Sequence, residues 1–135
     1  MYPRSLENSI TKYLPRKEII GIRGARQVGK TTLLKGFLSS VSGDQAFISM
    51  DLTEHRRALE ESPLDFIQRQ KRAGQKLTLF LDEIQKVNDA GEKLKIIYDH
   101  FPDVKILISG SSYLEIKSNV LPALVGRLLL FELYT

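Results

Sequence analysis

The sequence contains no cysteine and only two histidines among its 135 residues. The lack of cysteine excludes disulfides, thiol catalysis and thiolate metal sites. Two histidines, His55 and His100, are too few for a zinc site. No apolar run approaches the roughly 20 residues that a membrane-spanning helix needs, and the start of the chain carries no apolar export signal. These absences favour a cytoplasmic protein.

Charge of neither sign dominates the chain. Its 20 Lys and Arg residues face 16 Asp and Glu residues, which leaves a net charge of +4. This balance permits an anionic ligand but does not by itself indicate a nucleic-acid binder. With 42% hydrophobic and 27% charged residues, the composition is that of an ordinary folded protein, and the length suits one domain with a real core.

Short apolar runs alternate with segments of helical period along the chain. The runs predict strands over 18–23, 45–52, 77–81, 104–108 and 128–134. The segments predict helices over 31–40, 53–61, 64–73, 91–100 and 113–125, the last interrupted at Pro122. This alternation indicates an α/β fold with three layers and a parallel sheet covered on both faces. Ligands of such sheets bind beyond the carboxyl ends of the strands.

The residues after the first predicted strand match the phosphate-binding pattern G-x-x-x-x-G-K-[ST] in full. Glycines let consecutive backbone N–H groups turn toward phosphate oxygens, and the helix that follows adds its positive end. We expect Lys30 to reach the β- and γ-phosphates, Thr31 to offer its hydroxyl to Mg²⁺, and Thr32 to contact the α-phosphate. The predicted nucleotide-binding residues are Gly24, Ala25, Arg26, Gln27, Val28, Gly29, Lys30, Thr31 and Thr32.

Two acids follow the third predicted strand. Asp82 is expected to hold the Mg²⁺ shell, and Glu83 to polarise the attacking water as a general base. Neighbouring side chains of a strand point to opposite faces, so the two acids can take different tasks. Without the phosphate loop, the pair would be better interpreted as two solvated acids at a strand end. With the phosphate loop upstream, a functional site is the better interpretation. Since no guanine-reading Asn-Lys-x-Asp run occurs, ATP hydrolysis is favoured over GTP hydrolysis or kinase transfer.

Further polar groups lie at the ends of the later strands. Ser111 is the first choice, and Ser109 the second, for a hydroxyl that bonds the γ-phosphate or the attacking water. An ordinary turn that caps the next helix fits these serines equally well. Arg127 precedes the fifth strand and could stabilise transition-state charge. Because it enters that strand at the amino end, it would act from a neighbouring subunit; a surface arginine in a turn is the equal alternative.

Basic residues also gather between Gln68 and Lys76. No aromatic residues are interleaved with them to stack on bases. We therefore interpret this segment as a solvated helix end rather than a nucleic-acid surface.

Four segments together resemble the prokaryotic AAA-like P-loop ATPases, which join an N-terminal P-loop domain to a C-terminal domain of unknown function. The segments are 24–33, 81–87, 108–112 and 124–127. The resemblance spans almost the whole chain and implies a five-stranded sheet in the order 5-1-4-3-2. It implies that Lys30 and Thr31 belong to a Walker A motif. It implies that Asp82 and Glu83 belong to a Walker B motif.

The same resemblance implies that Ser111 is a sensor-like polar group and Arg127 a candidate arginine finger acting between copies in a homo-oligomer. Proteins of this kind usually continue into a lid or a second domain. We therefore expect residues 1–135 to be a single ATPase core that lacks both. Two alternatives stay open: an ATP-binding switch with negligible turnover alone, and an ATP-using protein that handles nucleic acid.

The phosphate-binding pattern generates the first prediction. Replacing Lys30 with alanine removes the ammonium group that would contact the phosphates, so Lys30→Ala should abolish nucleotide binding or nearly so. Calorimetric titration with ATP and Mg²⁺ measures this directly. Unchanged ATP affinity in the variant would remove the basis for the site.

Overall fold

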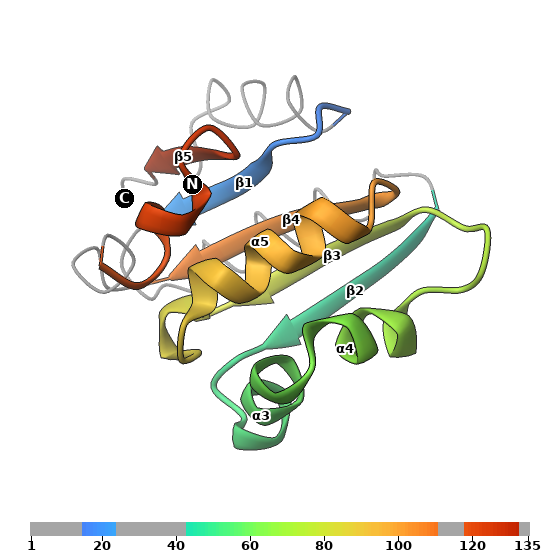
Figure 1. Ribbon diagram of the computed structural model, residues 1–135, viewed down its shortest axis with the longest axis horizontal. Helices are drawn as coiled ribbons and strands as arrows, with labels where there is room; N and C mark the ends of the chain where they lie inside the picture. The colour runs from blue at the N-terminus through green and yellow to red at the C-terminus, as the bar shows by residue number, and fades with distance from the viewer. Residues whose placement is uncertain (1–14, 24–42, 111–117, 133–135) are drawn as a thin grey trace, which may run out of the picture.

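The computed structural model describes residues 15–23, 43–110 and 118–132. Within them, five parallel strands form one sheet (Figure 1). The strands are β1 (Ile19–Arg23), β2 (Asp44–Ser49), β3 (Leu77–Asp82), β4 (Val104–Gly110) and β5 (Leu128–Glu132). Their order is β2-β3-β4-β1-β5, which is the predicted order read from the opposite edge. Strands β3 and β4 lie inside the sheet, and this explains why both are nearly continuous apolar runs.

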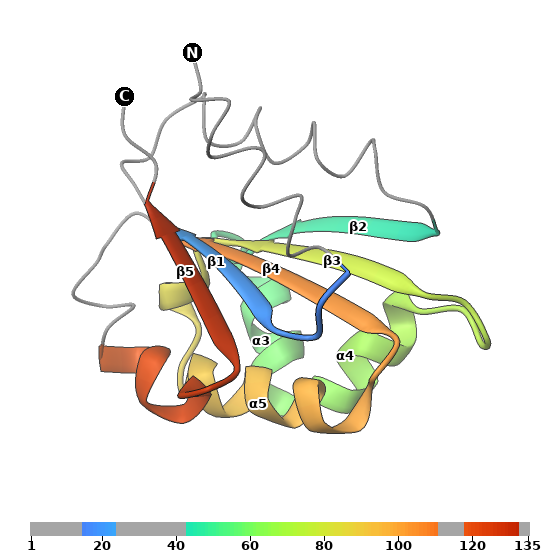
Figure 2. The same ribbon diagram turned by 90° about the horizontal axis from the view of Figure 1, so that it is seen from above.

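Three described helices cover one face of the sheet (Figure 2): α3 (Thr53–Glu61), α4 (Pro63–Gln70) and α5 (Ala90–His100). Helix α3 has the predicted bounds, whereas α4 ends before the predicted residue 73. The Ser62 hydroxyl caps α4 by accepting a hydrogen bond from the Asp65 N–H at 3.2 Å. Pro63 fits the first turn because its missing N–H would have no helical partner there. No described helix is long and apolar enough to cross a membrane.

The main hydrophobic core lies between the sheet and these helices. Its fully buried members come from the strands and the helices alike: Leu79, Leu81, Ile106, Ile108, Leu59, Phe66, Leu94 and Ile97. On the other face of the sheet, Ile20, Ile22, Phe80 and Leu107 are also buried. Burial on both faces makes the central strands a close-packed support, so residues at their ends occupy fixed positions.

The strands end together at one edge of the sheet. The register pairs Ser49 of β2 with Asp82 of β3, and Arg23 of β1 with Gly110 of β4. Because all the pairings are parallel, the segments that follow these four strands leave the sheet at this same edge. This edge is called the carboxyl edge below.

Strand β2 ends at Ser49, before the predicted end at residue 52. The guanidinium of Arg56 donates hydrogen bonds to the carbonyl oxygens of Met50 and Asp51, both at 2.9 Å. The Met50 N–H still donates to the Asp82 carbonyl at 2.8 Å, and the Arg56 bonds hold the turn that leads into α3. The strand pattern in the sequence does not contain this contact, because it depends on a side chain in the next element.

Several predicted elements lie outside the described residues: the phosphate loop, the helix over 31–40, and parts of the last predicted helix and strand. Of that last helix, Ser118 and Asn119 are helical, and the short 3₁₀ helix η2 (Leu121–Leu124) follows. The predicted helix is thus interrupted, but at Val120, two residues before Pro122, which lies in the first turn of η2.

At the opposite, amino edge of the sheet, Lys105 of β4 binds the residues that precede β1. Its Nζ donates to the carbonyl of Arg16 at 2.5 Å and to the carbonyl of Glu18. Partial burial lowers the pKa of Lys105 to about 8. In addition, the Ile19 N–H donates to the Arg127 carbonyl at 2.8 Å. The start of β1 is thereby held by β4 on one side and by the chain before β5 on the other.

Candidate functional site

Asp82 is the last residue of β3 and lies at the carboxyl edge. Its Oδ1 accepts a hydrogen bond from the N–H of Glu83 at 2.9 Å and another from the Ser109 hydroxyl. Ser109 is 1% exposed and belongs to β4, the neighbouring strand. Two donors from different segments therefore fix the orientation of this carboxylate.

Glu83 leaves the strand in a left-handed backbone conformation, with φ 53° and ψ 46°. A residue with a side chain adopts this region uncommonly, because Cβ crowds the following carbonyl. Glu83 is also almost fully buried, with 1% of its surface exposed. The sequence argument separated the two acids by strand alternation. The structure separates them by this turn, since β3 ends at Asp82.

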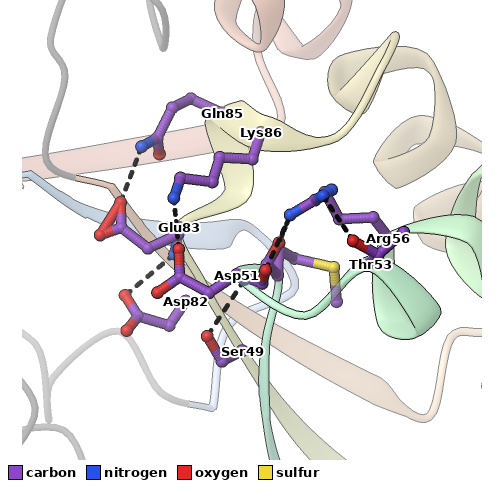
Figure 3. A network of polar contacts seen from close by, with 9 residues as sticks. Ser49, Asp51, Thr53, Arg56, Asp82, Glu83, Gln85 and Lys86 are labelled. Carbon is purple, nitrogen blue, oxygen red and sulfur yellow. Dashed lines mark hydrogen bonds and ion pairs between the residues drawn. The ribbon is translucent and has the colours of Figure 1, made fainter.

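Gln85 contacts Glu83 from the short 3₁₀ helix η1 (Ile84–Lys86). Its Nε2 donates to Glu83 Oε1 at 2.7 Å, and Figure 3 shows the side chain pointing toward that carboxylate. Gln85 is 8% exposed. Sequence reasoning gave Gln85 no role. The only signal in the sequence was a polar residue directly after Ile84, two positions from Glu83.

Asn119 holds the loop that carries Gln85. Its Nδ2 donates to the carbonyl of Gln85 at 3.2 Å and to the carbonyl of Val87 at 2.6 Å. Its Oδ1 accepts from the N–H of Ala90, the first residue of α5, at 3.3 Å. One amide therefore joins the segment after β4 to the loop after β3. No local sequence pattern predicts this contact.

A second set of polar contacts joins the loops after β2 and β3. Lys86 of η1 forms an ion pair with Asp51. The Ser49 hydroxyl accepts a hydrogen bond from the Asp51 N–H at 3.2 Å, and Arg56 donates to Thr53 at 3.0 Å (Figure 3). The Lys86–Asp51 pair is partly exposed, so its contribution to stability is small. Its structural effect is to hold the two loops side by side at the carboxyl edge.

A model of the AAA domain family matches residues 16–135, nearly the whole chain. The chain belongs to this family. An AAA domain is a nucleotide-binding domain of the ATPase type, and the predicted family and fold are thus confirmed. No protein of curated function matches the sequence.

Solved structures share the fold of this AAA domain. The C. elegans protein PCH-2 is similar to it with a TM-score of 0.63 and 16% identity, over 98% of this chain and 42% of that one. Katanin, in a structure that concerns its self-assembly, is similar with a TM-score of 0.51 and 18% identity, over 94% of this chain and 46% of that one. The AAA domain thus spans less than half the length of either chain.

Arg127 lies at the amino edge of the AAA domain. Its Nε is 3.7 Å from Asp99 Oδ1, and its guanidinium lies 5.8 Å from the ring centre of Tyr98. By the register, Arg127 is level with Thr78, so it lies about 13 Å from Asp82 along the strands and three strand spacings, about 14 Å, across the sheet. The structure therefore brings Asp82, Glu83 and Ser109 together and leaves Arg127 apart. Ser111 and residues 24–32 lie outside the described residues.

The donor atoms at the carboxyl edge suit Mg²⁺. Asp82 provides a carboxylate, and Mg²⁺ prefers such hard oxygen ligands. Within the described residues, no group of three or more His, Cys, Asp or Glu side chains could enclose a metal ion. A magnesium site with one or two carboxylates, completed by substrate phosphates, fits this donor set.

The contacts of Asn119 generate a stability prediction. Asn119→Ala leaves the carbonyls of Gln85 and Val87 without their donor, so the free energy of unfolding should fall by about 1–3 kcal/mol. Chemical denaturation with urea measures the loss. Asn88→Ala makes the same change at an exposed residue of the same loop and should alter stability by less than about 0.5 kcal/mol. Equal stability of the two variants would contradict the role of Asn119.

Proposed function

We propose that this AAA domain binds ATP with Mg²⁺ and hydrolyses the nucleotide. The proposal is carried by one observation: Asp82, fixed by two donors, and the buried Glu83 lie together at the carboxyl edge. The phosphate-binding pattern begins directly after β1, which is separated from β3 only by β4. Strand spacing puts the ends of β1 and β3 about 10 Å apart, so one nucleotide could meet both segments.

The binding residues act on the phosphates and the metal. In this proposal the backbone N–H groups of residues 24–32 and the ammonium of Lys30 bind the phosphate tail. Thr31 and Asp82 would hold Mg²⁺, which supplies charge neutralisation of the phosphates. The Asp82 task requires a carboxylate that does not rotate. Ser109 and the backbone of Glu83 meet this requirement through their two hydrogen bonds to Oδ1.

Glu83 is the proposed general base. It would accept a proton from the attacking water as that water adds to the γ-phosphate. Glu83 is 1% exposed, so bulk water competes little for its carboxylate. Its left-handed backbone directs it differently from Asp82, and this supports the assignment of separate tasks to the two acids. Ser111 stays the first proposed hydroxyl for the γ-phosphate.

Arg127 is proposed to act on the site of a neighbouring copy. Its place at the amino edge, held near Asp99 and Tyr98, is too far from the Asp82–Glu83 pair of its own chain. Copies that stack amino edge to carboxyl edge would bring the guanidinium of one to the γ-phosphate of the next. Katanin, which shares the fold, self-assembles. If assembly is weak, the AAA domain would instead hold ATP as a switch and turn it over slowly.

A role in nucleic-acid handling has less support. Two members of the basic segment are engaged with acids: Lys71 with Asp103 at 2.8 Å, and Arg72 with Asp44 at 2.8 and 2.6 Å. The guanidinium of Arg72 lowers the pKa of Asp44. These pairs fit the interpretation of the segment as a solvated helix end.

The general-base role predicts a specific defect. Glu83→Gln keeps the size of the side chain and an oxygen that Gln85 can donate to, but it cannot accept the proton. The variant should bind ATP with near-normal affinity while kcat falls about 10²- to 10⁴-fold. Phosphate-release kinetics and calorimetry separate the two effects. Glu92→Gln, at an exposed position on α5, is the control, and normal turnover of Glu83→Gln would exclude the role.

The arginine proposal predicts complementation between two defective variants. Arg127→Ala should lower kcat about 10³-fold, and Glu83→Gln is defective for the reason above. In a random equal mixture, about one quarter of the contacts join an intact Glu83 to an intact Arg127. The mixture should therefore regain turnover that rises with protein concentration. A mixture as inactive as its components, at concentrations where the wild type assembles, would contradict action between copies.

A further inference from the structure

Gln85 is a buried polar residue that the proposed mechanism has not used. Its neighbours Ile84 and Val87 are fully buried, and Gln85 itself is 8% exposed. Its Nε2 bonds Glu83, but its Oε1 has no hydrogen-bond partner among the described residues. Burying an amide with an unpaired oxygen costs free energy that an apolar side chain of similar size would not. Such a residue is expected where its one hydrogen bond serves a function.

The chemistry of the contact decides which way the amide faces. Turning the amide by 180° would set its oxygen against the Glu83 carboxylate, which places two acceptors in contact. The N–H donor therefore faces the carboxylate, as the structure has it. A hydrogen bond to an ionised group is shorter and stronger than one between neutral groups, in keeping with the 2.7 Å separation.

Hydrogen bonds to the backbone hold the segment that carries the Gln85 amide. Gln85 belongs to η1, and its carbonyl accepts a hydrogen bond from Asn119 at 3.2 Å. The N–H of Val87, the next residue but one, donates to the carbonyl of Ile84 at 3.1 Å. The backbone of Glu83 is held as well, since its N–H donates to Asp82 and its carbonyl accepts from the Lys86 N–H at 3.2 Å. Because the segment that carries Gln85 is fixed, its amide can restrict the rotation of the Glu83 carboxylate.

We propose that Gln85 is a positioning residue for Glu83. Its amide holds one carboxylate oxygen, so that the carboxylate presents a single orientation to the water that it deprotonates. This proposal rests on the proposed role of Glu83 as general base. Gln85 does not touch the nucleotide in this scheme, and its loss should affect kcat rather than ATP affinity.

The first test separates positioning from packing. Gln85→Met removes the donor and the unpaired oxygen while keeping an unbranched side chain of similar length. We expect kcat to fall about 10- to 100-fold with ATP affinity unchanged. The thermal unfolding midpoint should change little, because removing the unpaired Gln85 oxygen offsets the donor that Glu83 loses. Gln68→Met, at an exposed position of α4, is the matched control. Wild-type kcat in Gln85→Met would overturn the proposal, and so would a loss of activity that only follows a loss of stability.

The second test needs no turnover. The side-chain amide signal of Gln85 in a ¹⁵N NMR spectrum, assigned by its absence in Gln85→Met, should exchange slowly with solvent and shift in Glu83→Ala. A fast-exchanging signal that ignores Glu83→Ala would overturn the proposal whatever the kinetics show. If the wild-type protein binds ATP but does not hydrolyse it, the proposed function fails and the catalytic role of Gln85 fails with it. Hydrolysis that is insensitive to Gln85→Met removes the Gln85 proposal alone.

Discussion

Parallel pairing of β3 between β2 and β4 is the constraint on which the site depends. It makes the strands end at one edge, with Ser49 beside Asp82 and Ser109 close enough to donate to the Asp82 carboxylate. Antiparallel neighbours would send their following loops to opposite edges. The burial of β3 and β4 on both faces then makes this edge rigid, because close-packed strands cannot shift independently.

The elements that sequence predicts best are those whose pattern is complete within the element. Strand β3 is apolar at nearly every position because both of its faces are buried, and α3 consists mainly of good helix formers that end just before Pro63. The end of β2 was misplaced, because the chain turns at Met50 and Asp51, where Arg56 of the following helix binds both carbonyls. Boundaries of this kind depend on contacts between elements, and a local pattern does not record them.

In the candidate site, too, some features could be predicted from a local pattern and others depend on contacts between elements. Asp82 and Glu83 could be predicted because an acidic pair after an apolar strand has a chemical meaning next to a phosphate-binding pattern. The contacts of Ser109, Gln85 and Asn119 could not. Each joins residues that only the fold or a tight turn brings together, such as Asn119 and Val87 across separate segments. The left-handed turn at Glu83 was also hidden, since glutamate is not a residue that signals it.

That turn has a consequence for how position 83 would respond to selection. Glycine or asparagine would adopt the same backbone shape at lower cost, and neither would bring a carboxylate into an apolar interior. A screen of variants that rewarded only heat resistance would therefore tend to discard the acid. Under the proposed function, glutamate stands at this position for the proton that it accepts, at a backbone cost that folding alone would not require.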